Sequence, residues 1–281
     1  MLSRRRALFG FSAVLAATAI RATPALAQTQ SIVVASTTST HDSGLFSHLL
    51  PLFTKRTGIT VTVLAQGTGE ALDTARRGEA DVVFTHSKFS ELRFVTEGFG
   101  VKRLPVMYND FVLLGPKRDP AGVKGKDDVA AAMRTIMERR APFVSRGDRS
   151  ATHMTELMFW NRDVGVDIER EHGDWYKSAG LGMEATLEAA AEANGYVLCD
   201  RASWLAFKKR GELDILLEGD RRLFNQYAVV LVNPERHPQV KKELGQSFID
   251  WLRSEEGQKA IADFKIEGEP LFYPNAADPN A

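Results

Sequence analysis

The chain has 281 residues, of which 44% are hydrophobic and 26% charged, and its 36 basic residues balance 36 acidic ones. These values are typical of an ordinary globular chain that is long enough for one large domain or two of modest size. A chain without net positive charge is a poor nonspecific binder of nucleic acid or anionic membranes, so any anion site must be local. The single cysteine, Cys199, excludes an intramolecular disulfide, and its apolar setting predicts a buried small side chain.

The first 27 residues have the pattern of a signal peptide. Three arginines at positions 4–6 precede an apolar stretch over residues 7–20, and an Ala-Leu-Ala triplet that ends at Ala27 fits a signal-peptidase site. We therefore expect a mature periplasmic chain that begins near Gln28 and has 32 basic and 36 acidic residues. The segment around the arginines also resembles a twin-arginine export signal, with an ordinary secretory signal as the alternative. The apolar stretch is too short and interrupted to predict a membrane span.

Along the mature chain, short apolar runs rich in β-branched residues alternate with segments of helical periodicity. Such alternation is typical of a largely parallel sheet with helices on both faces. The predicted strands are residues 32–35, 59–64, 80–84, 142–145, 196–199 and 213–217. The predicted helices are residues 44–56, 69–77, 126–140, 152–160, 183–194, 202–210, 239–253 and 255–264. The first helix contains Pro51, which a kink accommodates.

Two segments have the pattern of connections between lobes. Residues 108–116 and 225–234 each begin with polar and aromatic residues, continue as a strand, and end in Gly-Pro or Asn-Pro. A chain that leaves one α/β lobe in the first segment and returns in the second makes the first lobe discontinuous. We therefore expect lobe 1 to comprise residues 28–112 and 228–281, and lobe 2 to comprise residues 113–227. Two such hinge strands let the lobes close over a ligand in the cleft between them.

Two hydroxyl-rich segments, residues 36–40 and 145–152, each follow a short apolar strand and lead into a helix. Backbone N–H groups at a helix start lack intrahelical partners, and the helix dipole places partial positive charge there. Serine and threonine hydroxyls add donors, and Arg146 adds charge. The pattern predicts two halves of a site for a small oxyanion. The alternative is that the hydroxyls only cap helices, with Thr40 and Asp42 capping the helix that follows them.

Arg146 is the residue that we predict to supply positive charge to this site. It follows a strand of buried type and precedes a glycine, which places it at the carboxyl edge of a sheet, where ligands of α/β proteins bind. A structural ion pair with Asp148 or Asp200 is the alternative. We expect Asp148 to orient Arg146 or to cap the next helix, because a negative charge repels an anion.

Six segments, taken in order, resemble the periplasmic tungstate-binding components of ABC importers, which have the type II periplasmic binding-protein fold. The resemblance covers essentially the whole mature chain, and the order of the segments makes it specific. The segments are residues 35–40 with 43–45, 67–72, 78–82, 108–111, 145–148 with Ser150 and Thr152, and Tyr196 with residues 200–201.

The resemblance implies an α/β protein of the Venus-flytrap type, in which each lobe is a mostly parallel sheet flanked by helices. It implies no cofactor and no catalysis, but capture of tungstate for an ABC permease and its ATPase; we also expect a monomer. Arg146 is then the charged ligand that separates this family from sulfate and molybdate binders that use neutral donors alone. The residues that the resemblance places against the anion are Thr38, Ser39, Thr68, Arg146, Ser150 and Thr152.

One position departs from the pattern of this family. Where the family has Ser-Gly-Thr, this chain has Ser150, Ala151 and Thr152. Glycine suits a turn that brings the backbone close to a ligand, whereas alanine disfavours a positive φ. The ligand contacts of Ser150 and Thr152 therefore depend on how the backbone accommodates Ala151.

Other ligands and one enzymatic function stay open at this stage. The same cleft suits molybdate, sulfate, phosphate or a small organic acid; size favours tungstate over sulfate but does not separate it from molybdate. A secreted hydrolase that uses Ser39, His41 and Asp42 is disfavoured, because residues so close in one turn do not easily form a nucleophile, base and orienting group. The Gly-x-Ser-x-Gly elbow is also missing. The six histidines show no spacing of metal ligands.

Overall fold

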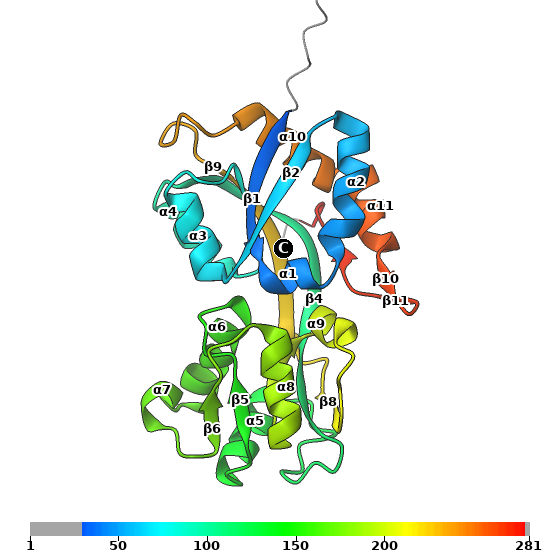
Figure 1. Ribbon diagram of the computed structural model, residues 1–281. Helices are drawn as coiled ribbons and strands as arrows, with labels where there is room; N and C mark the ends of the chain where they lie inside the picture. Colours follow the sequence, from blue (N-terminus) through cyan, green and yellow to red (C-terminus); the bar gives the residue numbers. More distant parts are fainter. Residues whose placement is uncertain (1–29, 279–281) are drawn as a thin grey trace, which may run out of the picture.

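A computed structural model describes residues 30–278 and has two α/β lobes connected by two strands (Figure 1). Lobe 1, at the top of Figure 1, contains the first and last parts of the described chain, and lobe 2 contains its middle. The predicted signal peptide, residues 1–27, lies outside the described residues. Within residues 30–278, no helix is long and apolar enough to cross a membrane.

The sheet of lobe 1 has the strand order β12-β4-β9-β3-β1-β2. β1 pairs in parallel with β2 and β3, whereas β9 runs antiparallel to both β3 and β4. The strands are β1 (Ser31–Thr37), β2 (Thr60–Gln66), β3 (Val82–Thr85), β4 (Gly100–Pro116), β9 (Phe224–Val232) and β12 (Tyr273–Pro274). A small hairpin of β10 (Lys265–Ile266) and β11 (Glu269–Pro270) precedes the last strand.

Helices cover both faces of this sheet, as the alternation of apolar residues along its strands requires. On β3, Val82 and Phe84 pack in the cluster that contains α2, α10 and α11, whereas Val83 packs on the opposite face with α3 and α4. Pro51 lies inside α2, as expected. The helices are α1 (Thr38–Asp42), α2 (Leu45–Thr57), α3 (Thr68–Arg76), α4 (Lys88–Thr96), α10 (Lys242–Arg253) and α11 (Glu255–Asp263).

Lobe 2 is organised around the second half of β4. This half pairs antiparallel with β7 (Val197–Asp200) and β8 (Leu213–Leu217), while β5 (Phe143–Ser145) pairs in parallel with β6 (Tyr176–Ser178). Two further hydrophobic clusters form its core, one of which contains the buried Cys199. The helices are α5 (Val129–Glu138), α6 (Ala151–Met158), the π-helix η1 (Phe159–Val164), α7 (Ile168–Glu171), α8 (Met183–Ala193), α9 (Arg201–Ala206) and the 3-10 helix η2 (Arg221–Leu223).

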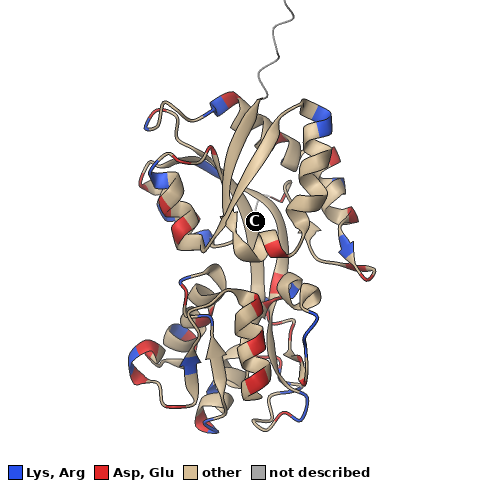
Figure 2. Ribbon diagram, in the orientation of Figure 1, with Lys and Arg blue, Asp and Glu red and all other residues tan. Residues whose placement is uncertain are grey.

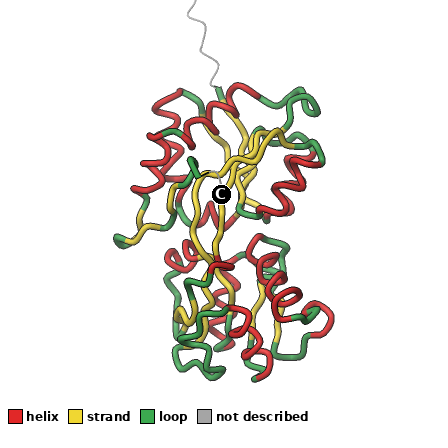
Figure 3. Tube along the Cα trace, turned by 180° about the vertical axis from the view of Figure 1, so that it is seen from behind, coloured by secondary structure: helices red, strands yellow, loops and turns green. Residues whose placement is uncertain are grey.

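Two long strands, β4 and β9, carry the chain between the lobes. β4 pairs with β9 as far as Asp110 and with β7 from Phe111 onward. Seen from behind, both strands pass through the narrow junction between the lobes (Figure 3). They run antiparallel because the chain leaves lobe 1 on one strand and returns on its neighbour. The eight-stranded sheet is therefore mixed, and less parallel than the sequence predicted for each lobe. The exact lobe boundaries at residues 112 and 227 stay a prediction.

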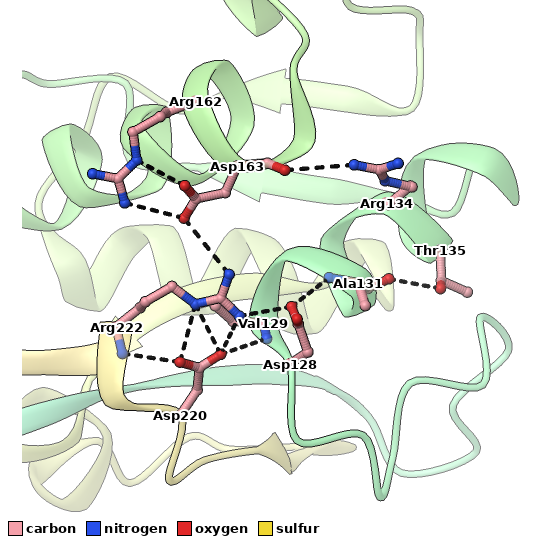
Figure 4. Close-up of polar contacts among 9 residues, drawn as sticks. All are labelled: Asp128, Val129, Ala131, Arg134, Thr135, Arg162, Asp163, Asp220 and Arg222. Atoms are coloured by element: carbon pink, nitrogen blue, oxygen red, sulfur yellow. Dashed lines mark hydrogen bonds and ion pairs between the residues drawn. The ribbon is translucent and has the colours of Figure 1, made fainter.

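A polar cluster fixes the lower end of β9 in lobe 2 (Figure 4). Arg222, two residues before the pairing region, forms ion pairs with Asp220 and with Asp128 at 2.7 Å. It also lies 3.8 Å from Asp163 in η1. Asp220 accepts the backbone N–H of Val129 at 2.9 Å. The hinge strand therefore begins from a segment that is tied to the start of α5 and to η1.

Candidate anion-binding site

A cavity of about 360 Å³ lies between the lobes, at the carboxyl ends of β1, β2, β5 and β6. Helices α1, α3 and α8 begin at its wall, and α6 begins beside it. The first N–H groups of a helix lack intrahelical partners, so helix starts are suited to anion binding. Figure 2 shows acidic and basic residues mixed over the outer helices and loops, so this local arrangement is not part of a basic surface. The cavity is lined by Thr38, Gly67, Gly69, Glu70, Arg146, Asp148, Arg149, Gly180, Leu181 and Gly182.

Arg146 lies on the wall of this cavity and is only 2% exposed. Its Nε and Nη2 donate to one carboxylate oxygen of Asp148, at 3.1 and 2.5 Å. The other oxygen of Asp148 accepts the backbone N–H of Ser150 at 3.0 Å. Asp148 therefore orients Arg146, as predicted. The alternative of a structural ion pair is met by Asp148, whereas Arg146 forms no ion pair with Asp200 within the described residues. Within the described chain, Nη1 of Arg146 has no hydrogen-bond acceptor, which leaves that part of the guanidinium for a ligand.

The turn that follows Arg146 requires glycine. Gly147 has φ of 62°, and a Cβ atom there would lie 1.8 Å from Oγ of Ser178. Arg149 also lies in the left-handed region, with φ of 58°. A left-handed conformation is rare for a residue with a side chain, so this turn is held tightly by its surroundings. It fixes the direction in which Arg146 leaves the strand.

Thr68 and Ser150 both lie at helix starts, and each accepts a backbone hydrogen bond. Oγ1 of Thr68, in lobe 1, accepts the N–H of Ala151, in lobe 2, at 3.1 Å. Oγ of Ser150 caps α6 by accepting the N–H of His153 at 3.2 Å. Because a hydroxyl also has a hydrogen to donate, both residues keep one donor for an anion.

Ala151 is accommodated without strain. It is the first residue of α6 and is not among the described residues with positive φ. Its N–H does not point free into the cavity, because Thr68 accepts it. The departure from the glycine of the family pattern therefore leaves Ser150 in the extended conformation of an N-cap and Thr152 in the first turn of α6.

Thr152 has the clearest unmet hydrogen-bonding potential near the site. It is 1% exposed, and its Oγ1 has no hydrogen-bond partner within residues 30–278. An unsatisfied buried hydroxyl costs roughly 1–3 kcal/mol, so native structures seldom contain one without a reason. A ligand oxygen at the start of α6 would remove this cost.

Thr38 and Ser39 begin helix α1 but are placed differently. Thr38 lines the cavity, whereas Ser39 is 3% exposed and is not among the residues that line it. Oγ of Ser39 is 3.2 Å from Nε2 of His86 and 3.2 Å from Oγ1 of Thr37. Thr37 caps α1 through the N–H of Thr40, and the cap of α2 is a glycine without a side-chain bond. The alternative in which Thr40 and Asp42 cap that helix is therefore wrong.

His86 and Asn225 are the polar residues of this region that the sequence reading missed. His86 directly follows β3 and so lies at the same sheet edge as the hydroxyl-rich segment after β1. Nδ1 of His86 is 3.0 Å from Oδ1 of Asn225 on the hinge strand β9. The sequence places His86 directly after a buried strand. A single histidine at such a position forms no motif, so the sequence did not mark it as a site residue.

A buried carboxyl group lies in lobe 2 behind the strand that leads to Arg146. Oε1 of Glu156 accepts the hydroxyl of Tyr176 at 2.8 Å and Nε1 of Trp160 at 3.2 Å. Burial raises the pKa of Glu156 to about 7, against the lowering effect of hydrogen bonds from Ser145, Tyr176 and Trp160. The charge of the Glu156 carboxyl group, which lies in the same lobe as Arg146, therefore changes near neutral pH.

A larger groove of about 840 Å³ lies between α4 and the α6–η1 segment. Its walls are mostly apolar and include Phe89, Leu92, Met154 and Phe224. A small dianion needs hydrogen-bond donors to replace its hydration, so we place the anion site in the smaller cavity beside Arg146. Residues 30–278 contain no group of three or more His, Cys, Asp or Glu side chains arranged to hold a metal ion.

The two-lobed fold, with hinge strands and a polar cavity at the junction, defines a solute-binding protein of the PBP superfamily, and residues 22–256 match the model of that superfamily domain. The tungstate-binding protein TupA of Peptoclostridium acidaminophilum is 47% identical over 251 residues, which are 88% of this chain and 86% of the relative. The chain belongs to the family of these TupA proteins.

Two solved structures agree with this assignment. TupA from Desulfovibrio alaskensis G20 is 45% identical, with a TM-score of 0.77 over 88% of this chain and 99% of that one. The tungstate ABC transporter structure from Geobacter sulfurreducens is 44% identical, with a TM-score of 0.76 over 83% of this chain and 98% of that one. The predicted two-lobed α/β fold of the type II binding proteins is confirmed.

Proposed function

We propose that this protein captures tungstate in the cavity between its lobes and delivers it to a membrane permease and its ATPase, as the binding component of an ABC importer. The observation that carries the proposal is Arg146, a buried cation with unpaired donors on the wall of a cavity where helices begin. Tungstate is suggested by the relatives that are named for binding it.

The donors around the cavity match the needs of a tetrahedral dianion. Such an ion loses its hydration on binding, so nearly every oxygen must receive hydrogen bonds, and bonds from charged donors are the strongest. Within residues 30–278, Nη1 of Arg146 and the hydroxyl of Thr152 have no hydrogen-bond partner, and Thr38 lies on the cavity wall. Thr68 and Ser150 each keep a hydroxyl hydrogen. Ser39 completes the proposed set through the backbone at the start of α1 and through its hydroxyl.

We further propose that the chain acts as a monomer in the periplasm, after export by the segment of residues 1–27. Capture by hydrogen bonds needs neither a cofactor nor covalent chemistry. Closure of the two lobes on β4 and β9 would bring donors from both lobes to one anion.

A hydrolase remains the second candidate, on one specific arrangement. Ser39, His86 and Asn225 follow one another in hydrogen-bond contact, which is the order of a nucleophile, a base and an orienting group. However, relatives that are 47% and 45% identical are named for binding tungstate, and Ser39 is 3% exposed in the described conformation. The histidine that is hydrogen-bonded to Ser39 is His86, and not the His41 of the hydrolase hypothesis that the sequence disfavoured. We therefore favour capture over catalysis.

Isothermal titration calorimetry tests this function directly. The chain from Gln28 onward, freed of bound anion, is titrated separately with tungstate, molybdate, sulfate and phosphate at one pH and ionic strength. We expect one-to-one binding of tungstate with weak or absent heats for sulfate and phosphate. Tighter binding of one of the other anions would identify that anion as the ligand. Absence of binding heat with all four would contradict the proposal of an oxyanion receptor.

A further inference from the structure

His86 connects helix α1, which begins at the anion cavity, to both hinge strands. Its ring is 6% exposed, and Nε2 lies 3.2 Å from Oγ of Ser39 in α1. Nδ1 lies 3.0 Å from Oδ1 of Asn225 on β9, and Nδ2 of Asn225 donates to Oδ1 of Asn109 on β4 at 2.7 Å. The ring stacks on Tyr227 with centroids 4.6 Å apart. One row of hydrogen bonds thus runs from the site to the junction between lobes.

The direction of each bond in this row follows from the amides. Because Nδ2 of Asn225 donates to Asn109, the atom that faces His86 is the carbonyl oxygen, which only accepts. Nδ1 of His86 must therefore carry a hydrogen. In the neutral ring, Nε2 is then an acceptor, and the hydrogen-bonded partner that donates to it is the hydroxyl of Ser39. The hydrogen of Ser39 consequently points away from the cavity.

This direction conflicts with the binding of an oxyanion, which offers acceptors only. A second proton on Nε2 removes the conflict, since the protonated ring donates to Oγ of Ser39 and leaves the Ser39 hydrogen for the anion. We propose that His86 positions the hydroxyl of Ser39, and that anion capture takes up a proton from solvent at Nε2 of His86, which turns that hydroxyl toward the anion. The same proton returns to solvent when the anion leaves. This inference rests on the proposed function.

The backbone around His86 holds the ring in this position. Oε1 of the buried Glu91 accepts the hydroxyl of Thr85 at 2.8 Å and the N–H of Ser87 at 2.8 Å, one residue to each side. Glu91 is in turn paired with Arg103 at 2.8 Å. The ring therefore cannot easily turn away from Ser39, and a change in its charge must act through the hydrogen bonds that it makes.

The groups around the ring leave it neutral until an anion arrives. Burial lowers the pKa of His86; Asp200 at the end of β7 and the bond to Asn225 raise it, and Arg146 lowers it. The ring also faces the titratable Tyr227 on β9 and the uncharged Phe111 on β4, and it lies on the wall of the larger groove, which the cationic Lys88 lines as well. Burial strongly raises the pKa of Tyr227, so it stays neutral. A dianion beside Ser39 adds negative charge, which favours the protonated ring.

Calorimetry in several buffers measures the proton directly. Wild-type protein is titrated with sodium tungstate near pH 7 in Pipes, Hepes and Tris, whose ionisation enthalpies differ. The slope of observed enthalpy against ionisation enthalpy gives the protons taken up per anion. We expect uptake between zero and one proton, with affinity falling by up to about tenfold per pH unit as the pH rises through the window of uptake.

The matched variants are His86→Gln, His41→Gln and His153→Gln. The amide nitrogen of glutamine replaces Nε2–H as a permanent neutral donor, so His86→Gln should bind tungstate without proton uptake and without pH dependence. The two other variants should keep the wild-type slope, since within the described residues the hydrogen bonds of the Ser39 hydroxyl are with Thr37 and His86.

Each outcome separates this inference from the function on which it rests. Tight tungstate binding by wild type with zero slope would overturn proton uptake and leave the receptor intact. A slope that persists in His86→Gln, or that disappears in His41→Gln or His153→Gln, would place the proton elsewhere and overturn the role of His86. Absence of heat with all four oxyanions would remove the proposed function and this inference together.

Discussion

Oγ1 of Thr68 in lobe 1 accepts the backbone N–H of Ala151 in lobe 2 at 3.1 Å, so the starts of two helices from different lobes are in direct contact. The contact lies beside the anion cavity, because Gly67 and Gly69 on either side of Thr68 line it. The described conformation therefore brings both halves of the site together.

Replacement of Thr68 by valine should weaken this closed arrangement. The change keeps the shape of the side chain but leaves the N–H of Ala151 without its acceptor, at a cost of roughly 1–3 kcal/mol. We expect a larger radius of gyration by small-angle X-ray scattering in the ligand-free protein, and weaker tungstate binding. Thr54→Val is the control, since its hydroxyl bonds only within lobe 1, to the carbonyl of Ile59. Equal scattering curves for wild type and Thr68→Val would contradict the prediction.

Arg146→Ala should reduce tungstate affinity by a factor of a hundred or more. Two hydrogen bonds from a charged donor contribute roughly 1.5–3 kcal/mol each, and every 1.4 kcal/mol is about tenfold in affinity. The matched control is Arg149→Ala, which removes the same charge from the same cavity wall but leaves the orienting contact with Asp148 intact. Circular dichroism checks that both variants fold. Equal losses of tungstate affinity in the two variants would show that only net charge matters and would contradict direct contact between Arg146 and the anion.

Thr152→Val should separate binding from stability. Because Oγ1 of Thr152 has no partner in the described chain, its replacement by a methyl group should leave the melting temperature of the ligand-free protein unchanged or higher. Tungstate affinity should fall about tenfold if the hydroxyl donates to the anion. Thr54→Val should behave in the opposite way, with lower stability and unchanged affinity. A loss of stability in Thr152→Val without a loss of affinity would show that the hydroxyl serves the fold.

The buried Glu156 predicts a dependence of stability on pH. Burial raises its pKa in the folded state to about 7, above the ordinary value of 4.5, so the folded state binds more protons between these values. The contribution of Glu156 to the free energy of unfolding is therefore fully present below pH 4.5 and is lost as the pH rises from 4.5 to about 7. We expect the melting temperature of wild type, compared with Glu156→Gln, to fall progressively from pH 5 to pH 7. The exposed Glu192→Gln serves as control, and parallel curves for wild type and Glu156→Gln would contradict the assignment.

Periodicity in the sequence predicted most of the fold, because most elements bury an apolar run or face. Each predicted strand and helix overlaps an observed element, for example residues 183–194 with α8. α1 was missed, since its five residues, Thr38–Asp42, have no apolar face and depend on the cap from Thr37. The π-helix η1 was read as the end of α6, because its first residues continue the same apolar pattern.

The candidate site was only partly accessible from the sequence. Thr38 and Arg146 line the cavity because each directly follows the last residue of a strand. The sequence could predict this placement, since it depends only on which residues come next along the chain. The partners of Ser39 and Thr68 could not be foreseen, since they are His86 and Ala151, which the fold brings from distant segments. Contact across such distances is a property of topology and packing.

The strand order also sets a sequence of events during synthesis. β9 lies between β3 and β4 in the sheet of lobe 1, so that sheet has a gap until residues 224–232 have left the ribosome. The strands of lobe 2, by contrast, are all available once Leu217 has been added. Lobe 2 can therefore complete its strand pairing while the sheet of lobe 1 still lacks β9. During that interval the apolar edges of β3 and β4 are open to chaperones, to proteases and to other nascent chains.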